Sequence, residues 1–313
     1  MVGVAVMVGV MVGVAVVVVV VVGVVVSVVV RVGVGVFMII HQHPMRHPSD
    51  GRIHFSELKE HRNSPAHVKA ACESSREITR PMRVGYVTDR LVFDGPYPLS
   101  HDVDGLGFRI WDAERRGNAW KDFAASNAGT CIVTRSEYLD AIASARAVRS
   151  SLLAMSLIDG AEVQRVAQWT AHGLPCASGI EGERGGFDII QSSPRGRRPY
   201  IADLKCTASS QPDELSRQCW RMLWHAQGAW YLDGAKALGM PAEDFYIIAV
   251  ESSPPYCVTV ARVPPELLEM GRRSVAMWAE KHRACEESGV WPGYTQAEVE
   301  LTVPGWVTLE ELS

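Results

Sequence analysis

Two short runs of alternating apolar and polar residues constrain the fold of this chain more than any other feature. One run spans residues 185–190 and the other residues 200–205, with a polar stretch that contains Gly and Pro between them. Because side chains alternate across a strand, Asp203 and Lys205 share one face of the second run. If the polar stretch turns the chain back as a hairpin, Asp188 faces the same spot. The sequence therefore predicts two acids and a lysine in one place.

A cluster of this kind fits the hydrolysis of a phosphodiester. Carboxylate oxygens hold Mg²⁺ or Mn²⁺, and the metal stabilises charge on the phosphate and lowers the pKa of a bound water. The lysine orients the attacking water or helps to deprotonate it. An Asp-x-Lys pair on a solvated strand face explains the same residues without a metal. The residues alone leave both interpretations open.

The order of these motifs resembles the PD-(D/E)xK nuclease superfamily. An acid, then D-x-K at residues 203–205, then Q-x-x-x-Y at residues 227–231 is similar to the RecB-like branch of that superfamily. The pattern is most similar to the RecE-like (exonuclease VIII) exonucleases of phages and prophages. Four further segments resemble elements of that group: residues 56–67, 85–93, 291–294 and 303–306. The similarity spans roughly residues 53–307.

The resemblance implies an α/β fold in which a central mixed β-sheet is flanked by helices, with a helical N-terminal part. The residue patterns agree, because segments typical of strands are surrounded by segments typical of helices. Helices are predicted over residues 56–83 with a break at Pro81, 113–125, 135–153, 213–238 and 265–287, and a strand pair over residues 245–250 and 256–263. The resemblance implies a helix over residues 85–93, although the β-branched residues there allow a strand.

The resemblance also implies which residues form the site. It assigns metal binding or catalysis to five side chains: Asp188, Asp203, Lys205, Gln227 and Tyr231. Asp188 and Asp203 are the implied metal ligands, with the backbone carbonyl of Leu204 as a further ligand, and Lys205 is the implied catalytic lysine. The residue pattern supports the remaining two, because positions four apart lie on one helix face.

Two further acids each have two interpretations. The family's G-T-A-V-H helix brings a histidine to the metal, whereas the aligned residues here end in Asp89. Aspartate offers hard oxygens that suit Mg²⁺ but has a shorter reach, so Asp89 is either a substituted ligand or the mark of a weakened site. Glu162 stands where RecB-like nucleases often place an extra acid. A surface glutamate is the alternative at that position.

Residues 1–37 form a separate low-complexity segment of valine and glycine, in which Arg31 is the only charged residue. The segment is long and apolar enough for a transmembrane helix, but no basic residue precedes it and no aromatic residues bracket it. We interpret it as translated repetitive DNA or a disordered stretch upstream of a start at Met38 or Met45. A membrane anchor and an ordered β segment are the alternatives. Residues 38–313 are expected to form the nuclease domain.

Charge and cysteine usage add two expectations. A net charge of −4 is unexpected for a protein that binds DNA. Basic residues do cluster at residues 195–198, 217–221 and 272–283, and each cluster is either a solvated face or a phosphate contact. The seven cysteines include no C-x-x-C pair. That spacing predicts reduced thiols in a cytoplasmic protein and no iron–sulfur cluster.

The sequence therefore predicts a Mg²⁺- or Mn²⁺-dependent exodeoxyribonuclease in the cytoplasm of a bacterium or a phage-infected cell. By the resemblance, it digests linear double-stranded DNA ends from 5′ to 3′ and leaves 3′ single-stranded tails for a single-strand annealing recombinase. The resemblance also implies a ring-shaped homo-oligomer that does not bind a membrane. Two alternatives are open: a nuclease-fold protein that binds DNA without cutting it, and a RecB-like nuclease specific for single strands or particular DNA structures.

Overall fold

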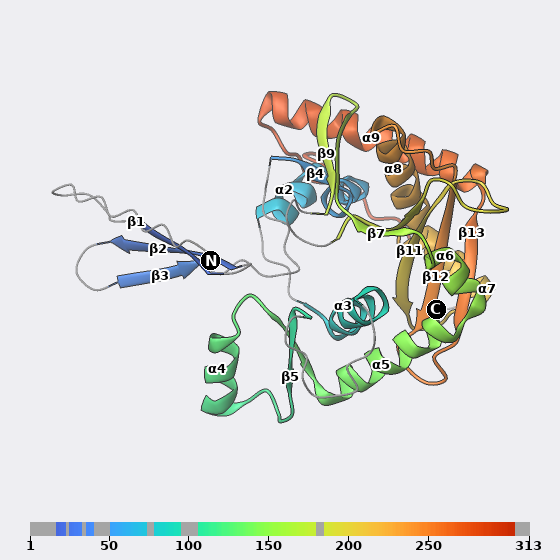
Figure 1. Ribbon diagram of the computed structural model, residues 1–313. Coiled ribbons are helices and arrows are strands. Elements are labelled where there is room, and N and C mark those ends of the chain that lie inside the picture. The colour runs from blue at the N-terminus through green and yellow to red at the C-terminus, as the bar shows by residue number, and fades with distance from the viewer. Residues whose placement is uncertain are drawn as a thin grey trace, which may run out of the picture.

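The computed structural model describes residues 17–22, 25–32, 36–40, 51–73, 78–94, 106–179 and 185–303. Its largest sheet has five strands in the order β13–β12–β11–β10–β7 (Figure 1). These strands are β7 (Glu162–Arg165), β10 (Phe187–Gln191), β11 (Tyr200–Thr207), β12 (Asp244–Glu251) and β13 (Val258–Val263).

The sheet is mixed, and the connections between its strands explain why. β10 and β11 follow each other along the chain and pair antiparallel, as the predicted hairpin requires. β11 and β12 pair parallel over their full length. The chain between them crosses over as helices α7 (Pro212–Arg221) and α8 (Trp224–Ala237), and a parallel pair needs a crossover of this length. β12 with β13 and β10 with β7 are antiparallel. The predicted mixed sheet is confirmed.

Helices cover both faces of this sheet, so its central strands are apolar on both sides. In β12, Ile247 packs into one core with residues of α8 and α9, and its neighbour Ile248 packs into a second core with residues of α3, α5 and α6. The helices not yet bounded are α3 (Arg80–Phe93), α5 (Arg135–Ser150), α6 (Leu152–Ile158) and α9 (Pro265–Ser288). Figure 1 shows α8 and α9 on one side of the strands and α3 and α5 on the other. The predicted α/β layering is confirmed.

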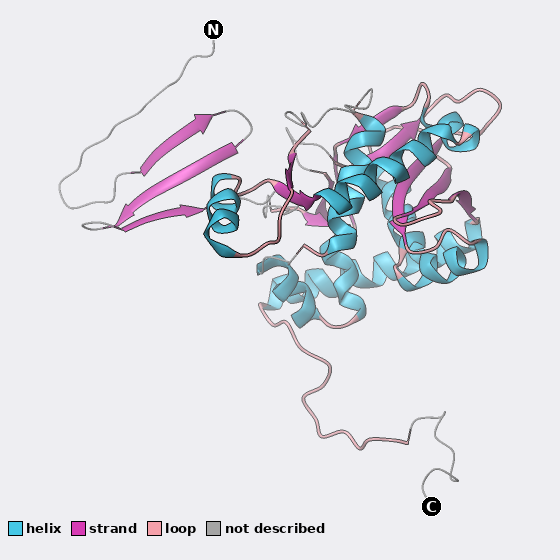
Figure 2. Ribbon diagram, turned by 90° about the horizontal axis from the view of Figure 1, so that it is seen from below, coloured by secondary structure: helices cyan, strands magenta, loops and turns pink. Residues whose placement is uncertain are grey.

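Smaller sheets complete the described structure. One is a hairpin of β8 (Ala167–Ala171) and β9 (Leu174–Ser178), extended by β4 (Ile53–His54). A second is the parallel pair β5 (Phe108–Trp111) and β6 (Cys131–Thr134), which helix α4 (Gly117–Ser126) connects along the chain. The third is an antiparallel sheet of β1 (Val17–Val22), β2 (Val25–Val32) and β3 (Val36–Ile40). In Figure 2 this last sheet lies apart from the rest of the molecule. The proposed origin of residues 1–37 stays a prediction.

Among the described residues, no single helix has the length and apolarity of a membrane span. The pair α5 and α6, bent by 85°, passes that test only when its two helices are taken together.

The single helix predicted over residues 56–83 is wrong. The described part of this stretch contains α1 (Phe55–Leu58), a 3₁₀ turn η1 (Lys59–Arg62), α2 (Pro65–Glu73) and the start of α3. Pro65 explains the break between η1 and α2, because proline disfavours helical geometry at the residue before it. Pro81 does not break a helix: it lies in the first turn of α3, where a missing N–H is tolerated.

The helix predicted over residues 213–238 is also divided. Leu223 adopts φ 61° and ψ 30°, a left-handed conformation that ends one helix and lets the next begin. Helix α8 therefore starts at Trp224. It is buried on nearly all sides because it lies between the sheet and α9.

A glycine determines how closely α8 approaches the sheet. A Cβ atom on Gly228 would lie 2.4 Å from Cδ1 of Phe245 in β12, well inside van der Waals contact. Only glycine permits this approach without displacing the helix. Gly228 follows Gln227 directly, so the close contact also sets how far the Gln227 side chain extends over β11.

Candidate active site

A buried ion pair lies on β11 at the centre of the sheet. Lys205 Nζ contacts Asp203 Oδ2, and both side chains are on the face that α8 covers, as their spacing in the strand predicted. Asp203 is 2% exposed. Although burial alone lowers the pKa of Lys205, the nearby Asp203 carboxylate raises it above its usual value. Lys205 is therefore held as an ammonium group.

Asp188 joins the pair where β10 and β11 separate. The ladder between the strands ends at Ile189 opposite Ala202, so the next residues, Asp188 and Asp203, lie just beyond the last paired position. The Asp188 carboxylate takes over one bond of the ladder, because the Leu204 N–H donates to Asp188 Oδ2 at 2.9 Å. A strand residue directs its N–H and C=O toward the same neighbour, so the Leu204 carbonyl faces this side as well.

Asp89 reaches the same place from α3. This helix packs on the second face of the sheet, with Val84 and Val87 in the same core as Ala202 of β11. Asp89 and Asp188 are bridged by one amide group: Gln164 Nε2 donates to Asp89 Oδ2 at 3.1 Å and to Asp188 Oδ1 at 3.3 Å. Asp89 and Asp188 are therefore neighbours, and Asp188 is also close enough to Asp203 for their charges to interact.

The electrostatics of these acids are unfavourable without a further cation. Burial raises the pKa of Asp188 well above its usual value, and the charges of Asp203 and Asp89 raise it further. Lys205 and the Leu204 N–H oppose that shift but do not cancel it. Asp188 therefore lies in a negative environment that Lys205 and the Leu204 N–H only partly offset.

Gln227 and Tyr231 complete one wall of the site from α8. Gln227 Nε2 donates to Tyr231 Oη at 2.8 Å and lies 3.5 Å from Asp203 Oδ1. Burial raises the pKa of Tyr231 to about 12, and the charge of Asp203 adds to the shift. Tyr231 is therefore a neutral phenol at physiological pH. The structure brings both predicted helix residues to the buried aspartate.

Glu162 is placed apart from the other predicted residues. It lies on β7, it is exposed, and its Oε1 accepts from Arg165 Nη1 at 2.8 Å. Gln164, two residues later on the same strand, occupies the position beside the acids. Sequence reasoning missed Gln164 and also Ser178, a buried residue at the end of β9 that hydrogen-bonds Tyr231. The only sequence signal for Gln164 was its place in the segment already singled out around Glu162.

The residues fit a divalent cation by their chemistry, but they do not form a closed cage. Carboxylate oxygens are the ligands that Mg²⁺ and Mn²⁺ prefer, and two of them here point at the hydrogen-bond donor of Gln164. In the part of the chain that the structure describes, no group of three or more His, Cys, Asp or Glu side chains is arranged to hold a metal ion. Two of the three acids therefore accept hydrogen bonds from one amide group.

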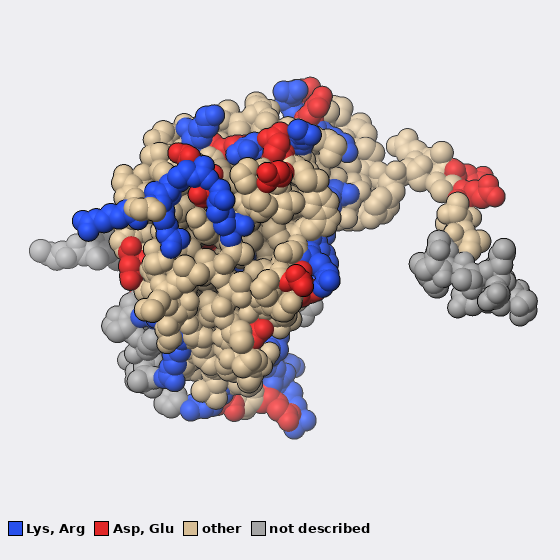
Figure 3. All heavy atoms as spheres, turned by 90° about the vertical axis from the view of Figure 1, so that its right-hand side faces the viewer, with Lys and Arg blue, Asp and Glu red and all other residues tan. Residues whose placement is uncertain are grey.

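The basic clusters predicted from the sequence are largely paired with neighbouring acids. Arg217 and Arg221 of α7 both contact Glu214, and Arg198 contacts Asp244 at 2.6 Å. Arg195, in the loop between β10 and β11, is exposed. Figure 3 shows Lys and Arg side chains gathered on the face that carries this loop, with acidic side chains among them. This pattern favours a solvated face over a continuous phosphate-binding surface there.

Comparison with known proteins agrees with the fold. The family described as "PDDEXK-like domain of unknown function (DUF3799)" matches residues 54–300. The crystal structure of a protein named "Putative exonuclease" from Eubacterium rectale is similar, with a TM-score of 0.54 and 13% identity over 86% of this chain and 98% of that chain. No curated protein matches. The predicted PD-(D/E)xK nuclease fold is confirmed.

Proposed function

We propose a nuclease function from the premise that this chain belongs to the family of PDDEXK-like domains of unknown function (DUF3799). The proposed enzyme is a Mg²⁺- or Mn²⁺-dependent exodeoxyribonuclease that hydrolyses the phosphodiester bonds of linear double-stranded DNA. The observation that carries this proposal is the buried Lys205–Asp203 pair next to Asp188 and Asp89. A structural ion pair needs no additional acids, whereas a site for phosphoryl transfer needs both the acids and the ammonium.

The RecE-like resemblance supports the finer statements of the proposal. They are digestion from 5′ to 3′, release of 3′ single-stranded tails for an annealing recombinase, a ring-shaped homo-oligomer, and action in the cytoplasm.

Three carboxylates would hold the metal: Asp188, Asp203 and Asp89, with the Leu204 carbonyl as a further ligand. When bound, the metal stabilises negative charge on the phosphate and lowers the pKa of a water molecule. Asp188 is fixed by the Leu204 N–H, so its second oxygen keeps a defined direction. The rigid β10–β11 hairpin therefore sets the separation of two of the three ligands.

Lys205 acts as a hydrogen-bond donor at the reacting phosphate. Its ammonium is kept charged and oriented by Asp203, and 20% of its side chain remains exposed, so it can contact a bound substrate. In this position it aligns the attacking water and stabilises the charge that develops on the phosphoryl oxygens. Asp203 is thus shared between the metal and the lysine.

Gln227 and Tyr231 position Asp203. The Tyr231 hydroxyl accepts a hydrogen bond from Gln227, and Gln227 extends to Asp203 Oδ1. Because Gly228 lets α8 lie directly on β12, this support is part of the helix–sheet contact and not of a mobile loop. Its effect on the reaction is indirect, through the direction of the carboxylate.

The experiment uses the purified full chain with four DNA substrates: linear duplexes labelled at the 5′ or the 3′ end, a closed circular duplex, and a single strand of the same sequence. Each is incubated with Mg²⁺, with Mn²⁺ or with a chelator. We expect release of nucleotides from the linear duplexes only, dependent on the metal, with the 5′ label lost first.

Two other outcomes would support the alternative functions. Metal-independent retention of DNA without any product identifies a binding protein, and faster digestion of the single strand identifies a strand-specific nuclease. Neither binding nor cleavage of any substrate, with folded protein and saturating metal, contradicts the proposal as a whole.

A further inference from the structure

One side chain of the site has no role in the reaction described so far. Gln164 of β7 lies between two of the three acids, and its single amide nitrogen donates to both of them, at 3.1 Å to Asp89 and at 3.3 Å to Asp188. The two acceptors come from different layers of the fold, α3 and β10. Gln164 is thus the residue that joins the helix to the hairpin at the point where the negative charge is concentrated.

The backbone at Gln164 is held in an unusual conformation. Its φ is 53°, in the left-handed region that residues other than glycine seldom adopt. Such a conformation costs on the order of 1 kcal/mol and persists only where the surroundings determine it. Here the neighbouring residues remain in register, with Val163 opposite Ile189 and Arg165 opposite Phe187. Gln164 is therefore held directly opposite Asp188.

A glycine just before β10 lets the two strands approach each other closely beside Gln164. A Cβ atom on Gly186 would lie 2.0 Å from the Arg165 carbonyl oxygen, so only glycine lets β10 pass this close to β7. Gly186 precedes Asp188 by two residues, and Arg165 follows Gln164 directly. The close approach thus occurs beside the amide and keeps its side chain near the acids.

An amide is suited to two different neighbours. Its NH₂ end donates to carboxylates, its oxygen end binds hard cations, and the terminal torsion that exchanges the two ends has a broad, nearly two-fold profile. With no cation present, two carboxylates next to each other favour the NH₂ end. With a divalent cation between them, an NH₂ group at the same point would be repelled and the oxygen end would be attracted.

We propose that Gln164 is a metal-responsive residue: its NH₂ group bridges Asp89 and Asp188 in the metal-free protein, and its Oε1 turns inward to bind the cation when metal enters. This inference rests on the proposed metal-dependent function and adds a ligand to it. It also explains why the acids beside Gln164 do not form a closed cage among the described residues. The amide keeps the site assembled until the metal replaces the NH₂ group.

The test compares two substitutions with opposite expected effects on metal affinity. Gln164→Glu adds a negatively charged ligand, and Gln164→Met keeps the length of the side chain but removes both ends of the amide. Gln191→Glu is the matched control, because Gln191 lies on β10 and donates instead to the Gly160 carbonyl at 2.7 Å. Mn²⁺ and Mg²⁺ binding is measured by calorimetry on the full chain without DNA, after circular dichroism shows that each variant is folded.

We expect the metal Kd of Gln164→Glu to be about tenfold lower than that of the wild type and the Kd of Gln164→Met to be about tenfold higher. Gln191→Glu should bind within about twofold of the wild type, since its added charge is remote from the ligands. Equal Kd values for all three Gln164 forms, or weaker binding by Gln164→Glu, would overturn the inference while leaving the nuclease proposal intact. A wild-type protein that takes up neither cation would overturn both.

A second measurement does not depend on the stability of Gln164→Glu. In the ¹⁵N–¹H spectrum of the full chain, the side-chain NH₂ signals of Gln164 are identified by their absence in Gln164→Met. On addition of Mg²⁺ these signals should shift as the NH₂ group leaves the carboxylates. An NH₂ pair that keeps its position through a titration in which Mg²⁺ demonstrably binds would overturn the inference.

Discussion

Helix α3 contributes to two clusters around buried carboxylates, and the clusters differ in their balance of charge. Near the start of the helix, Arg83 binds Glu137 of α5, and less than two turns further on, Asp89 faces Asp188. Glu137 is buried, and Asp89 and Asp188 are partly buried. The two clusters differ in the charged groups around each carboxylate, and those groups determine whether the carboxylate is neutralised.

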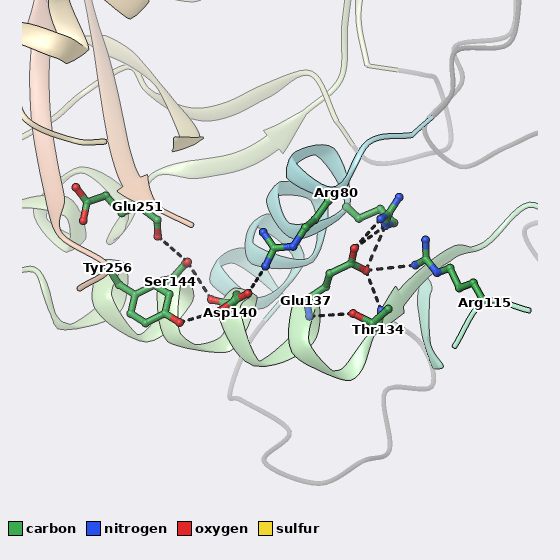
Figure 4. A network of polar contacts seen from close by, with 9 residues as sticks. Arg80, Arg115, Thr134, Glu137, Asp140, Ser144, Glu251 and Tyr256 are labelled. Atoms are coloured by element: carbon green, nitrogen blue, oxygen red, sulfur yellow. Dashed lines mark hydrogen bonds and ion pairs between the residues drawn. The ribbon is translucent and has the colours of Figure 1, made fainter. Parts of the chain in front are cut away.

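Glu137 is fully neutralised. Arg83 Nη2 contacts it at 2.6 Å, Arg115 Nη2 at 3.3 Å, and the Thr134 N–H donates to it at 2.8 Å, which together form the network in Figure 4. Although burial alone would raise the pKa of Glu137, the Arg83 hydrogen bonds and the Thr134 N–H lower it below its usual value. One carboxylate with two guanidinium groups needs no further ligand.

The cluster around Asp188 has the opposite balance. Burial and the charges of Asp203 and Asp89 raise the pKa of Asp188, and the ammonium of Lys205 does not cancel this shift. A buried carboxylate whose cations outnumber it indicates a structural role, whereas a buried excess of negative charge indicates a site for a cation that is not part of the chain. Substitutions in the two clusters test this distinction.

Lys205→Ala removes the only cation of the acidic cluster among the described residues. We expect cleavage of linear duplex to fall by about 10²–10⁴-fold, because a positioned proton or charge donor contributes that much to a transition state. DNA binding should be retained. Rates are measured with saturating Mg²⁺, beside Lys236→Ala, which alters an exposed lysine at the far end of α8. Wild-type cleavage by Lys205→Ala would show that the lysine has been assigned the wrong role.

Glu137→Gln tests the balanced cluster. The substitution leaves two partly buried guanidinium groups without their counter-ion, and we expect it to lower the free energy of unfolding by about 3 kcal/mol in urea titrations. The cleavage rate of the folded variant should equal that of the wild type. Asp188→Asn is the converse: it should not lower the unfolding free energy measured with a chelator, and it should abolish the cleavage measured with saturating Mg²⁺. The distinction fails if both variants lose stability equally.

The stability contributed by Glu137 should disappear in acid. Its pKa is lowered in the folded protein from a usual value of 4.5, so its contribution is present above that pH and is lost as the pH falls through the folded pKa. The difference in unfolding free energy between the wild type and Glu137→Gln should therefore be constant near neutrality and shrink below about pH 4.5. Urea titrations at a series of pH values measure it. A difference that grows in acid would contradict the assignment.

Asp89→Asn tests whether the helix contributes a ligand to the unbalanced cluster. Removing one charged ligand should raise the metal Kd, and the Mg²⁺ concentration for half-maximal cleavage, by about tenfold, because affinity follows the charge of the donor set. Calorimetry and metal titrations of the cleavage rate measure the two quantities. An unchanged Kd would leave only the hairpin acids as ligands.

Tyr231→Phe should have the smallest effect. It removes the hydroxyl that holds Gln227 but leaves the ring in the core, so we expect cleavage to fall by about 2–10-fold, the equivalent of one neutral hydrogen bond. The metal Kd should not change. Loss of metal binding in this variant would mean that α8 determines the position of the ligands more strongly than the structure indicates.

Much of the site was predictable because strand alternation and helix periodicity are local. The common face of Asp203 and Lys205, and that of Gln227 and Tyr231, follows from spacings of two and four residues. The roles of Glu162 and Gln164 were not predictable in this way. The left-handed backbone at Gln164 interrupts regular alternation, and the close approach that goes with it depends on a glycine in another strand.

The boundaries of the helices could not be predicted from local patterns either. The periodic pattern at residues 213–238 is correct on both sides of Leu223, but nothing local marks that leucine as the point where the helix ends. Tertiary packing determines the break, because α8 must lie between the sheet and α9 while α7 does not.

The parallel crossover between β11 and β12 has a consequence for how such proteins diversify. Six of the proposed site residues fall within the contiguous stretch 188–231, whereas Asp89 lies on α3 and Gln164 on β7. Under the proposed metal-binding role of Asp89, a substitution on α3 is expected to change the preference for one ion over another while leaving the β10–β11 hairpin and α8 unchanged.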